Sequence, residues 1–202
     1  MLLLAFDTAT DVATCAVSRD GEALAEGCTT VPKLLAEADG LLERVGAARS
    51  DLDAVVVGVG PGRYTSLRMG LVTARVLAFA LDVPVAGVST LDALAAGADG
   101  ALPLIDARRG EVFTLDRGPA CVRPEQAPVE PGRLCVGDGA VRYRTVFEAA
   151  GATVPPADDP RHVPWARHHA RLAETFGPAE LVEPLYLRAP DADRALERAA
   201  GR

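Results

Sequence analysis

The sequence is poor in the features of exported, membrane-embedded and disulfide-rich proteins. Its 202 residues include 4 cysteines and no C-x-x-C pair, so neither a disulfide framework nor a zinc ribbon is indicated. The apolar run at residues 2–6 is far shorter than the roughly 20 residues that a membrane helix needs, and no basic segment precedes it. We therefore expect a cytoplasmic protein that does not bind membranes.

Basic residues and recognisable catalytic motifs are also scarce. Lys33 is the only lysine and the formal net charge is −7, which disfavours autonomous binding to nucleic acid because such binding neutralises phosphates. There is no G-x-S-x-G nucleophile motif and no H-E-x-x-H metal motif. We assign no catalytic residue and no metal site, and we expect His162, His168 and His169 to be solvent-exposed helix residues.

The first half of the chain has a regular order of hydrophobic segments. Strands are expected at residues 2–6, 12–18, 22–29, 53–58 and 83–88, and helices at 32–45, 64–81 and 89–96, the last capped by Ser89 or Thr90. Three strands in a meander, followed by alternating helices and strands, are the plan of a ribonuclease H-like domain. Actin-like ATPases contain two such lobes, so an α/β fold of that class is predicted.

The second half repeats this plan in a thinner form. Strands are expected at 102–106 and 111–115, loops at 116–135, helices at 140–150 and 164–176, an extended segment at 183–188 and a polar helix at 191–200. We place the lobe boundary near residue 100. The first lobe is then residues 1–100, which bind the partner, and the second is residues 101–202.

Two short motifs could approach a nucleotide. Asp7, Thr8 and Thr10 follow the first strand, where an acid can organise magnesium and hydroxyls can approach phosphates. Gly137 and Gly139 form a second turn. The alternative is that both motifs simply build tight turns. The charged segment at residues 106–111 is open to two interpretations as well, a solvent-facing hairpin tip or a segment that shapes a cleft or a docking surface.

The segment G-P-G-R-Y-T-S-L-R, residues 60–68, turns a strand into a helix. It lacks the spacing and the lysine of a phosphate-binding P-loop, so we interpret it as a structural turn whose helix is capped by Thr65 or Ser66. The helix that follows is apolar on most sides, whereas a sheet can cover only one. We expect the uncovered side to meet a partner protein or a second copy, the alternative being a fully internal core helix. The predicted interface residues are Leu34, Leu41, Tyr64, Leu67, Arg68, Leu71, Arg75 and Leu77.

Five segments in this order resemble the bacterial TsaB (YeaZ) family. They read LLLAFDTATDVATCAVSRDGE, GVGPGRYTSLRMGLVTARVLAF, DVPVAGVSTLDALA, DARRGEVF and EPLYLRAPDA. The resemblance implies an actin-like ATPase fold of two lobes. It further implies a noncatalytic scaffold that supports a TsaD-like transferase in making N6-threonylcarbamoyladenosine at position 37 of tRNA.

The resemblance also implies partners and cofactors. The expected partners are the TsaD-like transferase, bound through the first-lobe helices in a heterodimer, and a TsaE-like ATPase. The chain could also form a homodimer when alone. Contact with tRNA is expected only through the partner. No cofactor is required, although weak binding of ATP or ADP with magnesium through the complex is implied.

The sequence departs from relatives at informative positions. Thr90 and Leu94 stand where the transferase carries its pair of metal-binding histidines, so a transferase-type metal site is not expected. Arg63, Tyr64 and Ser66 replace the usual loop residues, and Ser66 suggests a helical backbone there. A His-Ser pair usual in the family is missing from residues 29–33, which affects the expected partner surface.

Two other functions compete with the scaffold. One is a self-sufficient ATP-dependent small-molecule kinase of the actin-like superfamily, motivated by Asp7, Thr8 and the turn at residues 137–139. The lack of a second acidic phosphate motif weighs against it. The other is a metallopeptidase, a label once attached to this group, for which the metal ligands are absent from the sequence.

Overall fold

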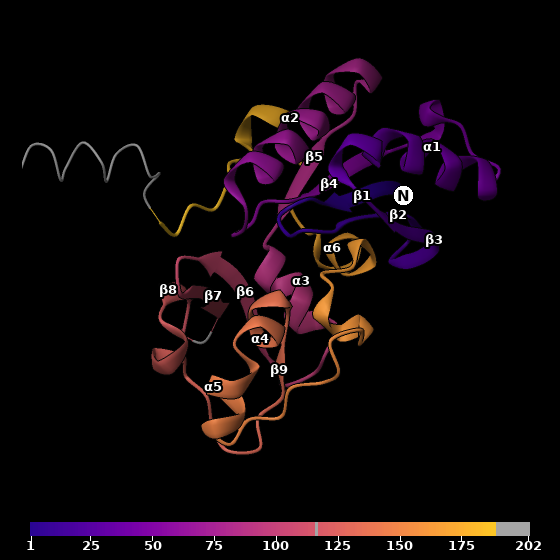
Figure 1. The fold of residues 1–202 in the computed structure, drawn as a ribbon. Coiled ribbons are helices and arrows are strands. Elements are labelled where there is room, and N and C mark those ends of the chain that lie inside the picture. The colour runs from indigo at the N-terminus through magenta and orange to yellow at the C-terminus, as the bar shows by residue number, and fades with distance from the viewer. Residues whose placement is uncertain (116, 189–202) are drawn as a thin grey trace, which may run out of the picture.

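The structure, a computed structural model, describes residues 1–115 and 117–188 of the chain. Within them two β-sheets lie in two lobes, each flanked by helices (Figure 1). The mixed α/β architecture predicted from the sequence is confirmed. The polar helix expected at residues 191–200 lies outside the described residues.

The first sheet has the strand order β3-β2-β1-β4-β5. Its strands are β1 (Leu2–Asp7), β2 (Ala13–Arg19), β3 (Glu22–Thr29), β4 (Ala54–Gly58) and β5 (Val85–Val88). The first three are antiparallel neighbours, and β4 and β5 continue the sheet in parallel with β1. β1 lies between two other strands and is buried along its whole length, which explains its uninterrupted apolar run.

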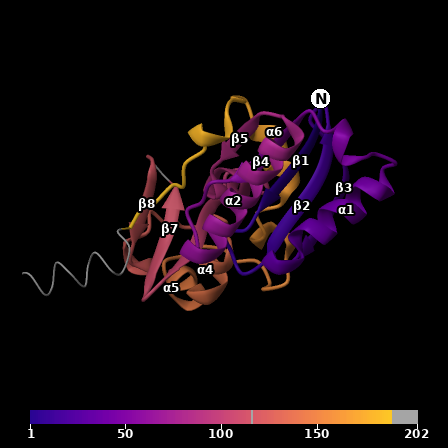
Figure 2. The same cartoon turned by 90° about the horizontal axis from the view of Figure 1, so that it is seen from above.

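Successive residues of β1 serve two different cores. Leu2, Leu4 and Phe6 pack with the helices α1 (Leu34–Arg44) and α2 (Tyr64–Leu81) on one face of the sheet. Leu3 and Ala5 pack with α6 (Ala166–Leu172) on the other face. Side chains alternate across a strand, so the first sheet is covered on both sides (Figure 2).

The second sheet has the order β8-β7-β6-β9. Its strands are β6 (Leu102–Arg108), β7 (Glu111–Leu115), β8 (Pro119–Val122) and β9 (Cys135–Val136). Leu91 and Leu94 of α3 (Thr90–Ala96) pack on one face of it. The helices α4 (Asp138–Arg142) and α5 (Arg144–Ala149) cover the other face with Ala140 and Phe147.

Short 3₁₀ helices complete several connections. They are η1 (Val31–Lys33), η2 (Arg49–Asp51), η3 (Pro124–Gln126), η4 (Pro160–His162) and η5 (Ala179–Leu181). No helix of the described residues combines the length and apolarity that crossing a membrane requires.

The C-terminal part of the chain returns to the first lobe, which corrects the predicted division at residue 100. α6 packs on β1 and β2, Gly177 pairs with Val85 in an antiparallel bridge, and Val182 lies in the first-lobe core. Residues 166–182 therefore complete the first lobe, although they follow the second lobe in sequence. The segment then runs on to the second lobe, where Leu187 packs against the core that contains Phe113.

Most predicted elements form, with differences at their ends. The spans of α2 and β3 agree with the prediction, and Ser89 caps α3 by accepting a hydrogen bond from the Asp92 N–H (3.3 Å). The region expected to be loops contains β8 and the first residue of β9, and the helix expected at 140–150 breaks at Tyr143 into α4 and α5. Residues 183–188 lie outside both sheets. The prediction that Thr65 or Ser66 caps α2 is wrong, since Arg63 occupies the N-cap position without a side-chain hydrogen bond.

Candidate functional site

The carboxylate of Asp7, at the C-terminal end of β1, is fully buried. Its Oδ1 accepts the Ala9 N–H (2.7 Å), and its Oδ2 accepts the Thr90 hydroxyl (2.6 Å) and lies 2.9 Å from Nε2 of His169. The other ring nitrogen of His169 faces the Trp165 carbonyl at 3.3 Å. The ring and the carboxylate, both fully buried, therefore form a close polar pair in which Nε2 of His169 faces Asp7. This pair joins β1 to α6, and Thr90 joins α3 to the same carboxylate.

Neighbouring elements pack closely around Asp7. A Cβ atom at Gly58 would lie 1.8 Å from the Asp7 carboxylate, which explains why β4 ends in glycine. Thr8 is also fully buried, and its hydroxyl donates to the Ser66 carbonyl (2.8 Å). Gly70 permits α2 to approach, because a Cβ there would lie 2.2 Å from the Thr8 hydroxyl. The Thr10 hydroxyl donates to the Val12 carbonyl, so all three side chains have protein partners.

The histidines correct one sequence expectation. His162, His168 and His169 are buried, with exposed fractions of 7%, 9% and 0%, whereas we expected them in solvent. His162 accepts the Gly137 N–H at Nδ1 (3.0 Å), and its Nε2 lies 3.2 Å from the Pro155 carbonyl. Among the described residues no three His, Cys, Asp or Glu side chains are grouped so that they could hold a metal ion.

The turn at Gly137 and Gly139 is explained by close packing on β6. A Cβ at Gly137 would lie 2.1 Å from the Leu104 carbonyl oxygen, and one at Gly139 would lie 2.9 Å from the Ile105 carbonyl carbon. Between them, Asp138 accepts the Asp106 N–H (2.9 Å). Burial raises the pKa of the Asp138 carboxyl, and this hydrogen bond opposes the rise. The turn thus fastens α4 to the second sheet.

The residues that the sequence suggested for a nucleotide are not brought together. Asp7, Thr8 and Thr10 are enclosed in the first lobe, and Gly137 and Gly139 lie against β6 in the second. None of them lines the cavity between the lobes. A nucleotide bound by these five residues stays a prediction, and the structure gives each of them a packing role instead.

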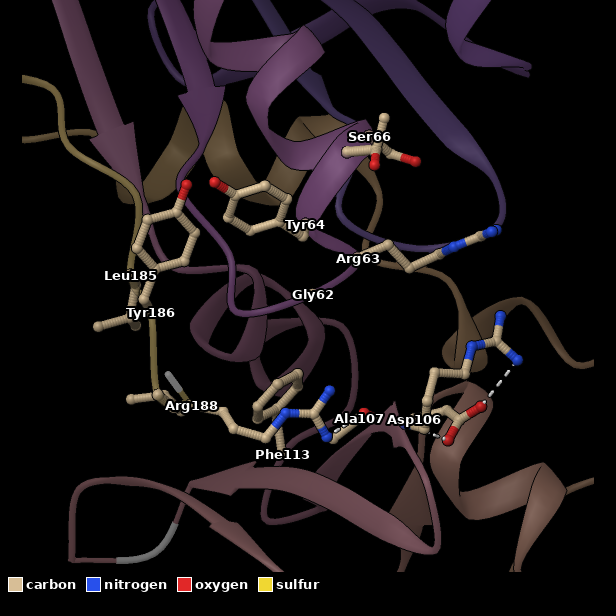
Figure 3. A pocket seen from close by; sticks show the side chains of 13 residues that line it. Gly62, Arg63, Tyr64, Ser66, Asp106, Ala107, Phe113, Leu185, Tyr186 and Arg188 are labelled. Atoms are coloured by element: carbon tan, nitrogen blue, oxygen red, sulfur yellow. Dashed lines mark hydrogen bonds and ion pairs between the residues drawn. The ribbon is translucent and has the colours of Figure 1, made fainter. Parts of the chain in front are cut away.

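A cavity of about 570 Å³ opens between the two lobes (Figure 3). The start of α2 forms one wall, the hairpin of β6 and β7 another, and the C-terminal segment a third. The hairpin at residues 106–111 therefore contributes to a cleft, one of its two predicted alternatives. The lining residues are Gly62, Arg63, Tyr64, Thr65, Ser66, Asp106, Ala107, Arg108, Phe113, Leu185, Tyr186, Leu187 and Arg188.

Three ion pairs and one hydrogen bond order the walls of this cavity. Asp106 is nearly buried, and its carboxylate pairs with Arg108 (3.0 Å) and with Arg142 (3.5 Å). Arg188 donates to the Ala107 carbonyl (2.8 Å) and pairs with Glu111 (3.0 Å). The C-terminal segment is thereby fixed to the second lobe.

The outer surface of α2 differs from the predicted interface. Leu34, Leu41, Leu67 and Leu71 are buried in the first-lobe core and Leu77 is partly buried against it, so choosing these leucines as the exposed side was wrong. These leucines are buried because α2 packs on β4 and β1, and α1 packs on β2 and β3. The large apolar side chains that α2 exposes are Tyr64 (45%), Met69 (47%), Val72 (57%), Val76 (60%) and Phe79 (89%).

Arg68 and Arg75 of the predicted interface lie at the side of this exposed row. Arg68 stacks over the Tyr64 ring, with its guanidinium carbon 5.3 Å from the ring centroid. The Tyr64 ring in turn stacks on Tyr186 at 5.4 Å. Arg75 donates to the Val182 carbonyl (2.5 Å), which holds the C-terminal segment against α2. Sequence reasoning missed Tyr186 and Val182 because they are more than 100 residues from α2.

Comparisons with known proteins agree with this fold. Residues 31–123 match the family model described as TsaD, tRNA N6-adenosine threonylcarbamoyltransferase. The uncharacterized protein Rv3421c of Mycobacterium tuberculosis (strain ATCC 25618 / H37Rv) is 36% identical over 203 residues, covering 94% of this chain and 93% of that protein. The tRNA threonylcarbamoyladenosine biosynthesis protein TsaB of Bacillus subtilis (strain 168) is 38% identical over 123 residues, which are 56% of this chain and 54% of that protein.

Two solved structures resemble the fold of nearly the whole chain. A Pseudomonas aeruginosa protein described as uncharacterized, with similarity to peptidase YEAZ, superposes with a TM-score of 0.77 at 30% identity and covers 93% of this chain and 99% of its own. The activator of the 2-hydroxyisocaproyl-CoA dehydratase from Clostridium difficile, at a TM-score of 0.50 and 13% identity, shares the fold alone. The architecture is that of the actin-like ATPases, and the chain belongs to the TsaB (YeaZ) family.

Proposed function

We propose that this chain is a noncatalytic, partner-binding subunit in the synthesis of N6-threonylcarbamoyladenosine at position 37 of tRNA. It supports a TsaD-type transferase, which performs the transfer and contacts the tRNA. The relatives named TsaB are tRNA threonylcarbamoyladenosine biosynthesis proteins, which supports the pathway. The observation that carries the proposal is the row of exposed apolar side chains on α2.

This row has the properties of a docking surface. Val72, Val76 and Phe79 are each more than half exposed and follow one another at helical spacing. Burying apolar surface gains about 25 cal/mol per Å², and a monomer rarely leaves such a patch uncovered. At the N-terminal end of the row, Tyr64, Arg68 and Met69 help to line a shallow groove that can receive a side chain of the partner.

The residues that follow β1 and β5 support a noncatalytic role. An acid that organises magnesium must present its oxygens to the ligand, whereas those of Asp7 are taken by Thr90, His169 and the Ala9 N–H. Thr90 and Leu94, which stand at the positions of the transferase histidines, are both buried. Leu94 packs in the second-lobe core, so neither side chain faces a substrate.

Binding to the cognate transferase tests the proposal. We expect Phe79→Asp and Val76→Asp to raise the dissociation constant about thirtyfold or more, the effect of losing about 2 kcal/mol at an interface anchor. Both side chains are exposed, so the unfolding midpoint of the isolated chain should stay unchanged. Leu24→Asp is the matched control, because Leu24 is also an exposed apolar residue (45%) but lies on the edge strand β3.

A reconstituted modification assay completes this test. Transferase, its ATPase partner and tRNA should form little modified adenosine without this chain, and Phe79→Asp should restore less product than the wild type. Equal binding of wild type and Phe79→Asp to the transferase would contradict the assigned face. Equal product formation with and without the chain would contradict the function.

The interlobe cavity favours one alternative, an ATP-dependent small-molecule kinase of the actin-like superfamily. Such an enzyme would hydrolyse or transfer phosphate with magnesium in the absence of other proteins. Phosphate release by the isolated chain separates the two functions. Sustained turnover that is lost in Asp7→Asn would replace the scaffold proposal by the kinase.

A further inference from the structure

We propose that the free edge of β5 binds an extended, basic segment of a partner protein. The site is a slot between this edge and residues 175–183, and it shares no lining residue with the cavity between the lobes. Three observations support it: the pairing of β5 stops short, an apolar slot opens where it stops, and unpaired carboxylates surround the slot.

β5 is the last strand of the first sheet, and only part of its outer edge is paired. Val85 exchanges two backbone hydrogen bonds with Gly177 (2.9 and 3.0 Å). Gly87 lies two residues further along β5 and therefore directs its N–H and carbonyl to the same edge. Thr175 would oppose Gly87 in a continued antiparallel ladder, but no backbone hydrogen bond joins these two described residues. Gly87 is exposed, so its backbone groups are open to another chain.

The slot, with a volume of about 280 Å³, lies where the neighbouring segment leaves β5. Pro178 has no N–H to extend the pairing, and η5 follows it directly. Val59 and Val182 give the slot an apolar lining, and Leu181 at its side is 74% exposed. Small-molecule sites usually measure about 300–1,000 Å³, so this slot suits a side chain of a peptide better than a free ligand.

The surroundings of the slot are acidic. Glu183 lines it, and Glu174 and Glu180 adjoin lining residues in the sequence, whereas no lysine or arginine lines it. All three glutamates are exposed, and none of them pairs with a cation among the described residues. By contrast, Glu26 and Glu37 of the same lobe each pair with an arginine. The three carboxylates are therefore available to a basic partner.

The charge and the free edge together identify the occupant. Carboxylates attract lysine and arginine side chains and repel phosphates, so the surface favours a basic protein segment over a nucleic acid. Addition of a strand to a sheet edge binds such segments in other proteins, because main-chain hydrogen bonds contribute affinity and alternate side chains contribute specificity. The occupant is an extended segment with an apolar side chain for the slot and basic side chains for the glutamates.

Fluorescence anisotropy of a labelled hexapeptide, RVRVRV with both ends blocked, titrated with the full chain tests the proposal. Its valines suit the slot and its arginines suit the glutamates. We expect a dissociation constant below about 1 mM. The peptide EVEVEV reverses the charge, and RPRPRP keeps the charge but cannot extend a β-ladder, because proline lacks an N–H. Each of these should bind at least about tenfold more weakly than RVRVRV.

Two variants test the slot and its charge separately. A Cβ at Gly177 would lie 3.7 Å from the Leu181 side chain, an ordinary contact, so Gly177→Phe adds a ring at the wall of the slot and should weaken RVRVRV at least about tenfold. Gly40→Phe is its control, since a Cβ at Gly40 of α1 meets nothing within 4 Å. Glu183→Gln should weaken the peptide about two- to fivefold, the range of an exposed ion pair. Glu43→Gln, at an exposed glutamate of α1, should leave affinity unchanged.

The amide signal of Gly87 in the wild-type chain locates the binding site directly. RVRVRV should shift this signal and slow its hydrogen exchange, and this measurement does not depend on the folding of any variant. Absence of binding at about 1 mM, an unchanged Gly87 signal, or equal binding of EVEVEV or RPRPRP would each overturn the proposal. Unchanged affinity in a folded Gly177→Phe would overturn it as well. The peptide assay contains no transferase, so its failure leaves the proposed function to be judged by the α2 variants.

Discussion

The ends of β1 and β6 are built alike and used differently. Asp7 ends β1 and Asp106 lies near the end of β6, and each carboxylate accepts the backbone N–H two residues further on, from Ala9 (2.7 Å) and Arg108 (2.9 Å). Each strand then turns into an antiparallel hairpin. The two lobes thus begin with the same local structure.

The partners of the two acids decide what each strand end can do. Asp7 is paired with a buried histidine and a buried threonine, so that end of the sheet is closed. Asp106 is paired with Arg108 and Arg142, whose side chains are 42% and 54% exposed, and it lines the cavity between the lobes, so the other strand end is open. An acidic residue at the end of a strand therefore indicates a ligand site only where its protein partners leave the carboxylate accessible.

Removing the partner of Asp7 should have the largest effect. His169→Ala leaves the Asp7 carboxylate buried without the ring that faces it at 2.9 Å, and we expect the free energy of unfolding to fall by about 3–5 kcal/mol, the cost of removing one partner from a buried polar pair. Urea denaturation monitored by circular dichroism measures this. His168→Ala is the matched control, since Nε2 of His168 has no partner among the described residues. Equal losses in the two variants would show that the contact between His169 and Asp7 contributes nothing specific to stability.

Thr90→Val should have the next largest effect. Valine keeps the shape of threonine but cannot donate to Asp7, and a hydrogen bond to a charged group contributes about 1.5–3 kcal/mol. We expect a loss of that size in the same denaturation experiment. In Asp7→Asn the carboxylate charge is already absent, so adding Thr90→Val there should cost less than in the wild type. Additive losses would show that the two residues do not interact.

A smaller, pH-dependent effect should come from His168, the neighbour of His169 in α6. Burial, followed by the charges of Arg167, Arg171 and His169, lowers the pKa of His168 from 6.5 to about 4. As the pH falls from 6.5 towards 4, the unfolded chain takes up this proton first, so stability present above pH 6.5 is progressively lost. His168→Gln should flatten the decline in unfolding midpoint over that window. An unchanged slope would assign the decline to other groups.

The sequence predicted the elements better than their partners. The strands and helices follow local hydrophobic patterns, so the span of α2 could be stated in advance. The burial of Asp7 could not, because His169 is 162 residues away and reaches it only when α6 returns to the first lobe. The histidine pair after the proline-rich linker is the one available signal in the sequence, and its polar character favours a solvent-exposed position instead.

The exposed face of α2 shows the same limit. A helix that is apolar all round does not reveal which side the sheet will cover, since leucine and valine at neighbouring positions give similar patterns. The structure places Leu67 and Leu71 inward, and Val72 and Val76 outward. Only the position of β4 beneath the helix distinguishes the two sets.

Arg142→Ala should have the smallest effect and completes the comparison from the Asp106 side. Asp106 keeps Arg108 and the Arg108 N–H when Arg142 is removed, and its carboxylate lies beside an open cavity instead of in a closed core. Exposed guanidinium groups contribute little to stability because water screens them. The unfolding midpoint should therefore stay within experimental error of the wild type. A loss as large as that of His169→Ala would mean that both strand ends depend on their counter-ions equally, and the difference between the two lobes would then have to lie elsewhere.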